Sequence, residues 1–221
     1  MTDDLLRYLE SYLTDNRKKL FQKVLNERTK HFTVVLEDIY QPHNTSAVIR
    51  SCDIFGIQDV YTIENEFTNK ISRHVARGSH KWVNIHRFKK DTDNTIPCLD
   101  HVQQQGYQLI ATSPHIDSTY LPDFDISTKT AFIFGREKEG ISDIIKERAD
   151  GFLKIPMYGF TESLNISVAV AIILQYVTSK LKVSHLDWQL QPSEKREIYE
   201  HWVRKTIKNV DMIIDHYLER N

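Results

Sequence analysis

The chain has 221 residues, of which 40% are hydrophobic and 27% charged, and its formal net charge is −1. This balance is typical of one large globular domain with extensions and excludes a disordered tail or a collagen-like chain. No apolar run approaches the roughly 20 residues of a membrane span, and the acidic N-terminus does not resemble a signal peptide. The two cysteines are too few for a disulfide framework or a four-cysteine zinc site. We therefore expect a cytoplasmic protein without a metal.

Short apolar strands and longer helices alternate along the chain. The first 30 residues are expected to form one helix with an apolar stripe. Strand segments rich in Val, Ile, Tyr and Phe follow at 33–39, 60–63, 82–88, 107–112, 130–134 and 152–155. Further helices are expected at 44–55 and 95–105, each followed by a glycine, and at 166–177 and 193–220. The alternation predicts an α/β fold with a mainly parallel sheet, whose ligands bind beyond the carboxyl ends of the strands.

The two helical ends differ in pattern from the middle of the chain. We therefore expect an N-terminal helical extension over residues 1–30, an α/β core over 31–182 and a C-terminal helical extension over 183–221. Both extensions carry clustered basic residues. Packing against the core and contact with RNA are both open as roles for them.

Positive charge is concentrated in one part of the core. Between Phe67 and Lys90 there is no Asp or Glu, and the segment contains Lys70, Arg73, Arg77, Lys81, Arg87, Lys89 and Lys90. Such a block is typical of a surface that contacts phosphates, although a solvated face has the same composition.

Several common sites are excluded by the motifs that the sequence lacks. It has no phosphate-binding G-x-x-x-x-G-K-[ST] loop and no G-x-G-x-x-G loop after a strand. It also lacks H-E-x-x-H, paired C-x-x-C and G-x-S-x-G, which removes the usual zinc and serine-hydrolase interpretations. Cys52 could be a nucleophile, but a small buried hydrophobic residue is the better interpretation.

Three polar segments follow predicted strands. The first is His43-Asn44-Thr45-Ser46-Ala47-Val48-Ile49-Arg50, in which Asn44 is a natural N-cap. Arg50 is six residues further on, roughly on the same side of the helix, and an arginine in an apolar helix needs an anionic or hydrogen-bonding partner.

The second segment, Phe134 to Ser142, has the sequence FGREKEGIS, in which glycines flank a carboxylate and allow a ligand to approach the backbone. The third, Ile155 to Ser167, has the sequence IPMYGFTESLNIS and leads into a helix that is apolar on all sides. Ser163 or Asn165 is expected to cap that helix, and the helix itself should be buried in a core or a subunit interface.

Together, the three segments resemble the three signature motifs of the SpoU family of RNA ribose 2′-O-methyltransferases, within the SPOUT superfamily. The resemblance runs from about Thr33 to Lys180 and includes Gly78-Ser79, Trp82-Val83 and Ala111-Thr112-Ser113. Within the family the chain is most similar to the tRNA guanosine 2′-O-methyltransferases. The reasons are the sequence PHNTSAVIRSCDIFGIQDV, the helical ends and the lack of a separate domain before the core. The resemblance implies a deep trefoil knot in the C-terminal part of the core, an exception to the rule that chains do not thread loops.

The resemblance also implies a chemistry. A homodimer, with active sites completed across its interface, would transfer a methyl group from S-adenosylmethionine to a ribose 2′-hydroxyl. Thr112, Gly135, Ile155 and Leu164 match the cofactor positions. The matching catalytic positions are Arg50, with Asn44, Glu137, Ser163 and Asn165 in support.

Arg50 is the main catalytic residue that the resemblance implies. Because the pKa of an arginine lies above about 12, we favour stabilisation of the developing alkoxide and clamping of a phosphate over proton abstraction. Arg136 replaces a glutamine that often precedes the motif glutamate, which affects only the charge of the local loop.

The expected substrate is the D-loop guanosine at position eighteen of tRNA. Ribosomal RNA or another tRNA site is the alternative target, because RNA is read through shape and unstacked bases. A knotted RNA-binding protein without catalysis is the alternative of a different class, disfavoured because Arg50, Asn44, Glu137 and Asn165 are all present. The residues expected to contact RNA are Arg17, Lys18, His43, Arg73, Arg77, Lys81, Lys195 and Arg196.

Overall fold

The computed structural model describes residues 1–68, 70–90, 92–113 and 118–220, and of Arg73 it describes the backbone only. The chain divides into two compact units. The smaller contains Met1–Arg28 together with Gln189–Asn221, and the larger contains Thr29–Trp188. Both ends of the chain therefore belong to the smaller unit.

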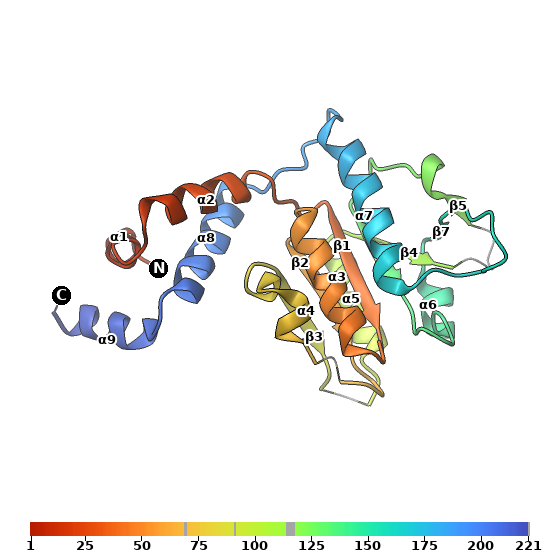
Figure 1. The fold of residues 1–221 in the computed structure, drawn as a ribbon, viewed down its shortest axis with the longest axis horizontal. Helices are drawn as coiled ribbons and strands as arrows, with labels where there is room; N and C mark the ends of the chain where they lie inside the picture. Colours follow the sequence, from red (N-terminus) through yellow and green to blue (C-terminus); the bar gives the residue numbers. More distant parts are fainter. Residues whose placement is uncertain (69, 91, 114–117, 221) are drawn as a thin grey trace. The chain divides into compact units, whose positions relative to one another are not determined.

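Within the described residues, the larger unit contains one sheet of seven strands (Figure 1). In chain order they are β1 (Phe32–Glu37), β2 (Asp59–Ile63), β3 (Asn84–Phe88), β4 (Gln108–Thr112), β5 (Thr119–Tyr120), β6 (Thr130–Phe134) and β7 (Gly151–Lys154). Their order in space is β3-β2-β1-β6-β4-β7-β5, and every neighbouring pair is parallel. The predicted α/β fold with a parallel sheet is confirmed, and the trefoil knot stays a prediction.

Helices cover both faces of the sheet in the larger unit (Figure 1). The helices α3 (Pro42–Ile54) and α7 (Ile166–Lys182) pack on one face, and α5 (Thr95–Gln104) and α6 (Asp143–Arg148) on the other. Because side chains alternate along a strand, Val34 and Leu36 belong to the first core and Val35 to the second. Among the described residues of this unit, the remaining helical pieces are α4 (Arg73–Ala76) and two single 3-10 turns, Ser79–Lys81 and Leu121–Asp123.

The ends of the core helices test the predicted stop and start signals. Gly56 and Gly106 follow α3 and α5 with φ of 78° and 83°, so the predicted glycine stops are confirmed. Asn165 caps α7 as expected, since its side chain accepts a hydrogen bond from the Ser167 backbone N–H. The prediction that Asn44 caps α3 is wrong, because the helix already begins at Pro42 with Gln41 in the cap position.

The helix α7 is apolar, but one chain does not bury it on all sides. Val168 and Ile172 are 45% and 38% exposed, whereas Val170 and Ile173 are buried. The predicted all-round burial is therefore not found within a single chain. No helix of the described residues has the length and hydropathy that a membrane crossing requires.

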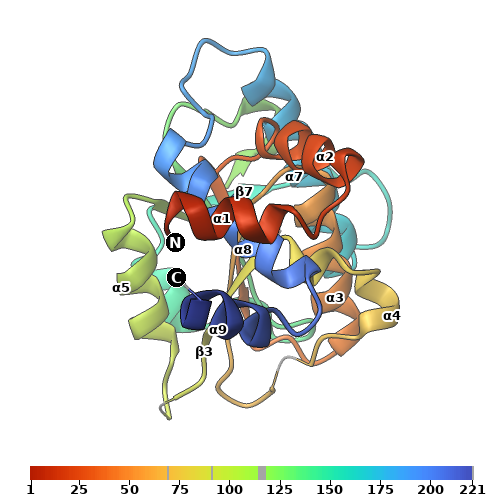
Figure 2. The same cartoon turned by 90° about the vertical axis from the view of Figure 1, so that its left-hand side faces the viewer.

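The smaller unit contains α1 (Asp3–Glu10), α2 (Asp15–Leu25), α8 (Pro192–Thr206) and α9 (Val210–Arg220), shown in Figure 2. The predictions of one helix over 1–30 and one over 193–220 are wrong. Thr14 starts a new helix by capping the Arg17 N–H, and Asn209, with φ of 52°, interrupts the second segment. In this unit α1, α2 and α8 bury apolar side chains, including Leu9, Phe21, Leu25 and Trp202, whereas α9 buries none.

Candidate active site

The three polar segments meet at the carboxyl edge of the sheet. Glu137, just after β6, accepts a hydrogen bond at Oε1 from Asn44 Nδ2 at 3.0 Å. Asn165, at the start of α7, donates from Nδ2 to Asn44 Oδ1 at 3.2 Å. The result is a hydrogen-bonded chain, Asn165–Asn44–Glu137, that takes one residue from each segment across 121 positions of sequence. Three of the five predicted catalytic positions, Asn44, Glu137 and Asn165, belong to this hydrogen-bonded chain.

Glu137 also provides the cap that α3 lacks. Its carboxylate accepts the backbone N–H groups of Tyr40 at 3.1 Å and Gln41 at 3.3 Å, and Gln41 makes no side-chain cap bond of its own. A carboxylate at a helix N-terminus is favoured by the helix dipole. This contact explains why Asn44 is available to join the second and third segments instead of capping its own helix.

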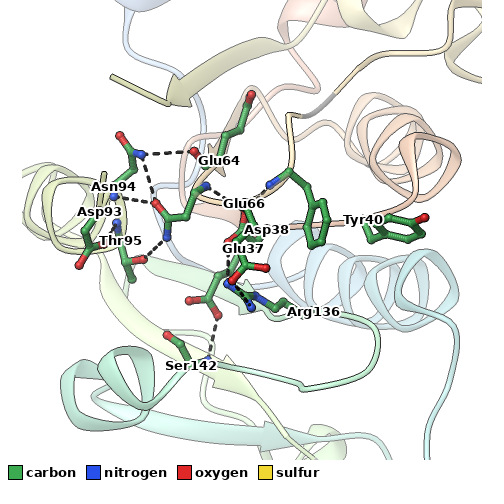
Figure 3. A network of polar contacts seen from close by, with 12 residues as sticks. Glu37, Asp38, Tyr40, Glu64, Glu66, Asp93, Asn94, Thr95, Arg136 and Ser142 are labelled. Atoms are coloured by element: carbon green, nitrogen blue, oxygen red, sulfur yellow. Dashed lines mark hydrogen bonds and ion pairs between the residues drawn. The ribbon is translucent and has the colours of Figure 1, made fainter. Parts of the chain in front are cut away.

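An ion pair between Asp38 and Arg136 lies at the same edge of the sheet (Figure 3). Asp38, which follows β1, is fully buried and has a left-handed φ of 50°. Its Oδ2 binds Arg136 Nη2 at 2.8 Å, and Arg136 also pairs with Glu66 at 2.9 Å. Burial opposes the charge of Arg136, but Asp38 and Glu66 together raise the pKa of its guanidinium. The arginine that departs from the motif pattern therefore links the ends of β1, β2 and β6.

The other oxygen of Asp38 organises the loop after β2. Oδ1 accepts the backbone N–H groups of Asn65, Glu66 and Phe67 at 2.9, 2.9 and 3.1 Å. Three N–H donors and a guanidinium satisfy a carboxylate that would otherwise be costly to bury. The sequence interpretation did not identify Asp38 or Glu66. The available signal was the pair Glu37-Asp38 at the end of an otherwise apolar strand.

The loop after β6 is held against β1. Glu37 Oε2 accepts the Ser142 N–H at 3.0 Å, and burial raises the pKa of Glu37 despite this bond. A Cβ added to Gly135 would lie 2.3 Å from the backbone of Gly140. The close approach of the loop's own backbone therefore requires a glycine at position 135, whether or not a ligand is bound. We call Glu37, Asp38, Glu66, Arg136, Glu137, Asn44 and Asn165 the carboxyl-edge network.

Arg50 and Ser163 lie outside the carboxyl-edge network. Six helical residues separate Arg50 from Asn44, about 9 Å along the axis and about 120° around it. Asn44 is buried and Arg50 is exposed, so the expectation that they share a side is wrong. Within the described part of the chain, the Arg50 side chain has no hydrogen bond or ion pair, so its expected anionic or hydrogen-bonding partner stays a prediction. Ser163 is exposed in the segment before α7.

The positions expected to bind the cofactor gather at neighbouring strand ends. Thr112 ends β4, Gly135 follows β6 and Ile155 follows β7, and these three strands are adjacent in the sheet. Thr112 donates a hydrogen bond to the Ile133 carbonyl at 3.0 Å. A cavity of about 500 Å³ opens at the end of β7, and Ile155 lines it. The full lining is Tyr120, Pro122, Asp123, Lys154, Ile155, Pro156, Met157 and Tyr158. Leu164 is 39% exposed, in the segment before α7.

The residues expected to contact RNA divide into exposed and engaged groups. His43, Arg77 and Lys81 are exposed in the larger unit, and the side chain of Arg73 lies outside the described residues. In the smaller unit Arg17 is exposed and its guanidinium lies 5.9 Å from the centroid of the Phe21 ring, and the other three residues make polar contacts. Lys18 pairs with Asp15, Lys195 donates to Asn26, and Arg196 pairs with Asp3 and Glu200.

The sequence matches the model of the SpoU rRNA Methylase family over residues 31–175, the span that contains the sheet and all three polar segments. The chain belongs to this family. It is 39% identical over 216 residues to a tRNA (guanosine(18)-2′-O)-methyltransferase of Borreliella burgdorferi, covering 96% of this chain and 97% of the relative. It is 34% identical over 194 residues to the Thermus thermophilus protein of the same name, covering 87% and 98%.

A solved structure has a similar fold over most of the chain. The crystal structure of the A. aeolicus TrmH/SpoU tRNA modifying enzyme superposes with a TM-score of 0.77 at 32% identity, covering 88% of this chain and 98% of that one. The similarity therefore includes most of both units and not the α/β core alone.

Proposed function

We propose that this protein transfers a methyl group from S-adenosylmethionine to the 2′-hydroxyl of the guanosine at position 18 of tRNA. The observation that carries the proposal is the hydrogen-bonded chain Asn165–Asn44–Glu137, which assembles one polar residue from each motif at the carboxyl edge of the sheet. The match to relatives named for this reaction, over nearly the whole chain, supports the choice of tRNA over ribosomal RNA.

The strand ends fit a cofactor held mainly by backbone groups. Thr112, Gly135 and Ile155 present main-chain groups at three adjacent strand ends, where ligands bind in parallel α/β sheets. The cavity of about 500 Å³ beside Ile155 falls within the usual size of small-molecule sites. These residues and Leu164 would hold S-adenosylmethionine, which supplies a methyl group activated by a positively charged sulfur.

The polar residues would prepare the ribose oxygen. Asn44 is fixed at both ends of its amide, by Glu137 and Asn165, so it can orient a ribose without rearrangement. A hydroxyl attacking a methyl group develops negative charge as its proton leaves. Arg50 would stabilise that charge and clamp an adjacent phosphate, and exposed Ser163 would give a further hydrogen bond.

We further propose that the active enzyme is a homodimer whose sites combine two chains. Arg50 faces away from Asn44 within one chain, although the chemistry needs both at one ribose. The exposed Val168 and Ile172 of α7 form an apolar stripe that a second copy would cover. The cytoplasmic location and the absence of a metal remain predictions.

The substrate is tested with an unmodified tRNA transcript and labelled S-adenosylmethionine. Methyl transfer should occur at guanosine 18, located by mass spectrometry of nuclease fragments. The control transcript carries 2′-deoxyguanosine at that position and should accept no methyl group. A methyl group at another nucleotide, or transfer to ribosomal RNA fragments alone, would refute the proposed target.

The shared site is tested by purifying a mixed dimer of two inactive variants. Arg50→Ala and Glu137→Ala should each lower the transfer rate about a hundred- to a thousandfold. If Arg50 acts at the partner's Asn44–Glu137 site, the mixed dimer contains one intact site and should recover about half of the wild-type activity. An inactive mixed dimer, with both parent dimers intact by sedimentation, would place the whole site in one chain.

A further inference from the structure

An aromatic pair stands at the edge of the carboxyl-edge network. The Tyr40 ring is 65% exposed and packs edge-on against Phe67, with ring centroids 5.0 Å apart and planes at 75°. Figure 3 shows Tyr40 beside the network, on the side away from Asn94 and Thr95. Phe67 contacts one side of the Tyr40 ring and leaves most of its surface open to solvent.

Both aromatic residues are held through their backbone N–H groups by carboxylates of the carboxyl-edge network. Asp38 accepts the Phe67 N–H directly, and it turns the chain through a left-handed conformation two residues before Tyr40. The Tyr40 N–H is itself bound by Glu137, the carboxylate that also holds Asn44. The ring therefore projects from a backbone that is fixed relative to the proposed catalytic residues.

The folded chain gains little from this ring. A tyrosine that is two-thirds exposed contributes little apolar burial. The left-handed conformation of Asp38, two residues before it, is strained and persists only where surrounding contacts hold it. Such strain is concentrated at binding and catalytic sites. An exposed aromatic side chain on a rigid backbone is the usual support for an unstacked nucleobase.

The basic segment that begins at Phe67 favours a nucleic acid as the occupant. Phe67 is the first residue of the segment without Asp or Glu, and exposed Lys70 and Arg77 follow it. The Ser72 N–H binds Ser46 Oγ at 2.8 Å, which holds this basic segment against α3, close in sequence to Asn44. Aromatic and basic residues interleaved in this way provide stacking together with phosphate contacts.

We propose that Tyr40 is the base-stacking residue of the active site, and that its ring stacks on the nucleobase of the nucleotide to be methylated. Phe67 acts as a positioning residue that supports the ring edge. This inference rests on the proposed function and extends it by naming the group that holds the target base. Because every base has a flat face, the stacking holds the nucleotide in place and does not itself select guanine.

The test compares Tyr40→Ala, Tyr40→Phe and a matched control, Tyr12→Ala. Tyr12 is 50% exposed and packs edge-on against Tyr8 at 5.5 Å, so the control removes a ring of similar environment from the smaller unit. In single-turnover transfer at saturating tRNA, Tyr40→Ala should be slower about fivefold to a hundredfold. Tyr40→Phe should keep close to the wild-type rate, and Tyr12→Ala should too. Calorimetric binding of S-adenosylmethionine should be equal in all four proteins.

A second measurement detects the stack itself. A tRNA transcript with 2-aminopurine at position 18 should fluoresce weakly when wild-type protein binds it, because stacking quenches the base, and more strongly with Tyr40→Ala. Equal fluorescence and equal rates for the two proteins would overturn the role of Tyr40 while leaving the methyltransferase proposal intact. If wild-type protein transfers no methyl group to tRNA, the proposed function is refuted. The difference in fluorescence between wild type and Tyr40→Ala then tests, by itself, whether Tyr40 stacks on a base.

Discussion

Two clusters of buried charge lie at opposite edges of the sheet and are built differently. The carboxyl-edge network follows the ends of β1, β2 and β6, whereas Asp59 begins β2 at the amino edge. Asp59 accepts hydrogen bonds from Asn84 at 3.0 Å and His86 at 2.8 Å, and Lys30 Nζ lies 3.8 Å away. We call Asp59, Asn84, His86 and Lys30 the Asp59 cluster.

The two clusters differ in where their partners lie and in how much of each cluster is buried. In the Asp59 cluster the main partners sit on adjacent strands, and the carboxylate is 5% exposed. Burial alone would raise the pKa of Asp59, but His86, Lys30 and Asn84 together hold that pKa below its ordinary value. In the carboxyl-edge network, by contrast, buried Asp38 is strained and the outer members Glu137 and Asn165 are exposed. At the amino edge the charged groups stabilise one another around the buried Asp59. At the carboxyl edge they hold Glu137 and Asn165 in positions that are exposed to solvent.

Removing the centre of the carboxyl-edge network should have the largest effect. Asp38→Ala removes the buried partner of Arg136, which still pairs with Glu66, and leaves three backbone N–H groups without their acceptor. It should lower the free energy of unfolding by about 3–5 kcal/mol. Asp38→Asn keeps an acceptor and tolerates the left-handed backbone, so it should cost less. Urea unfolding followed by circular dichroism measures both. A loss below about 1 kcal/mol for Asp38→Ala would mean that the network does not depend on this ion pair.

Changing the Asp59 cluster should alter stability without altering catalysis. Asp59→Asn should lower the free energy of unfolding at neutral pH by about 1–3 kcal/mol, because hydrogen bonds to a charged acceptor are lost. The folded-state pKa of Asp59 is depressed, so its contribution is present above the unfolded pKa of about 4 and is lost as pH falls through the folded value. Wild type should therefore lose stability more steeply than Asp59→Asn below about pH 4. Identical pH profiles would contradict this assignment, and a fall in methyl transfer under stable conditions would show that the amino edge also serves catalysis.

Reversing surface charge should have the smallest effect per residue and should leave both clusters intact. Arg73, Arg77 and Lys81 changed together to Glu should weaken tRNA binding, with each lost phosphate contact reducing the slope of log affinity against log salt by about 0.7–0.9. Each exposed contact should contribute less than about 1 kcal/mol, because solvent and salt screen it. The control reverses Lys129, Lys146 and Lys182, which gives the same change in net charge elsewhere on the larger unit. Equal binding by the two triple variants would identify the basic segment as a solvated face.

Local sequence patterns determined much of the core. The strand at 130–134 is found as predicted, and Gly56, Gly106 and Asn165 end or begin helices as their conformational preferences require. These features depend on φ preferences, hydrogen-bonding side chains and apolar spacing within a few residues, so they can be read without the fold. The two-residue strand β5 was too short to show such a pattern.

Tertiary structure alone decided the partners of the polar residues. The sequence marks Asn44, Glu137 and Asn165 as polar exceptions near strand ends, but their hydrogen bonds join positions 93 and 121 residues apart. Asn44 could not be assigned as a cap or a bridge until Glu137 was known to bind the start of α3. Asp38 and Arg136 are 98 residues apart, and only the parallel order of β1 beside β6 brings them together. The exposure of Arg50 is also decided by the tertiary structure. The sheet buries one face of α3, and this burial fixes the direction of every other side chain on the helix.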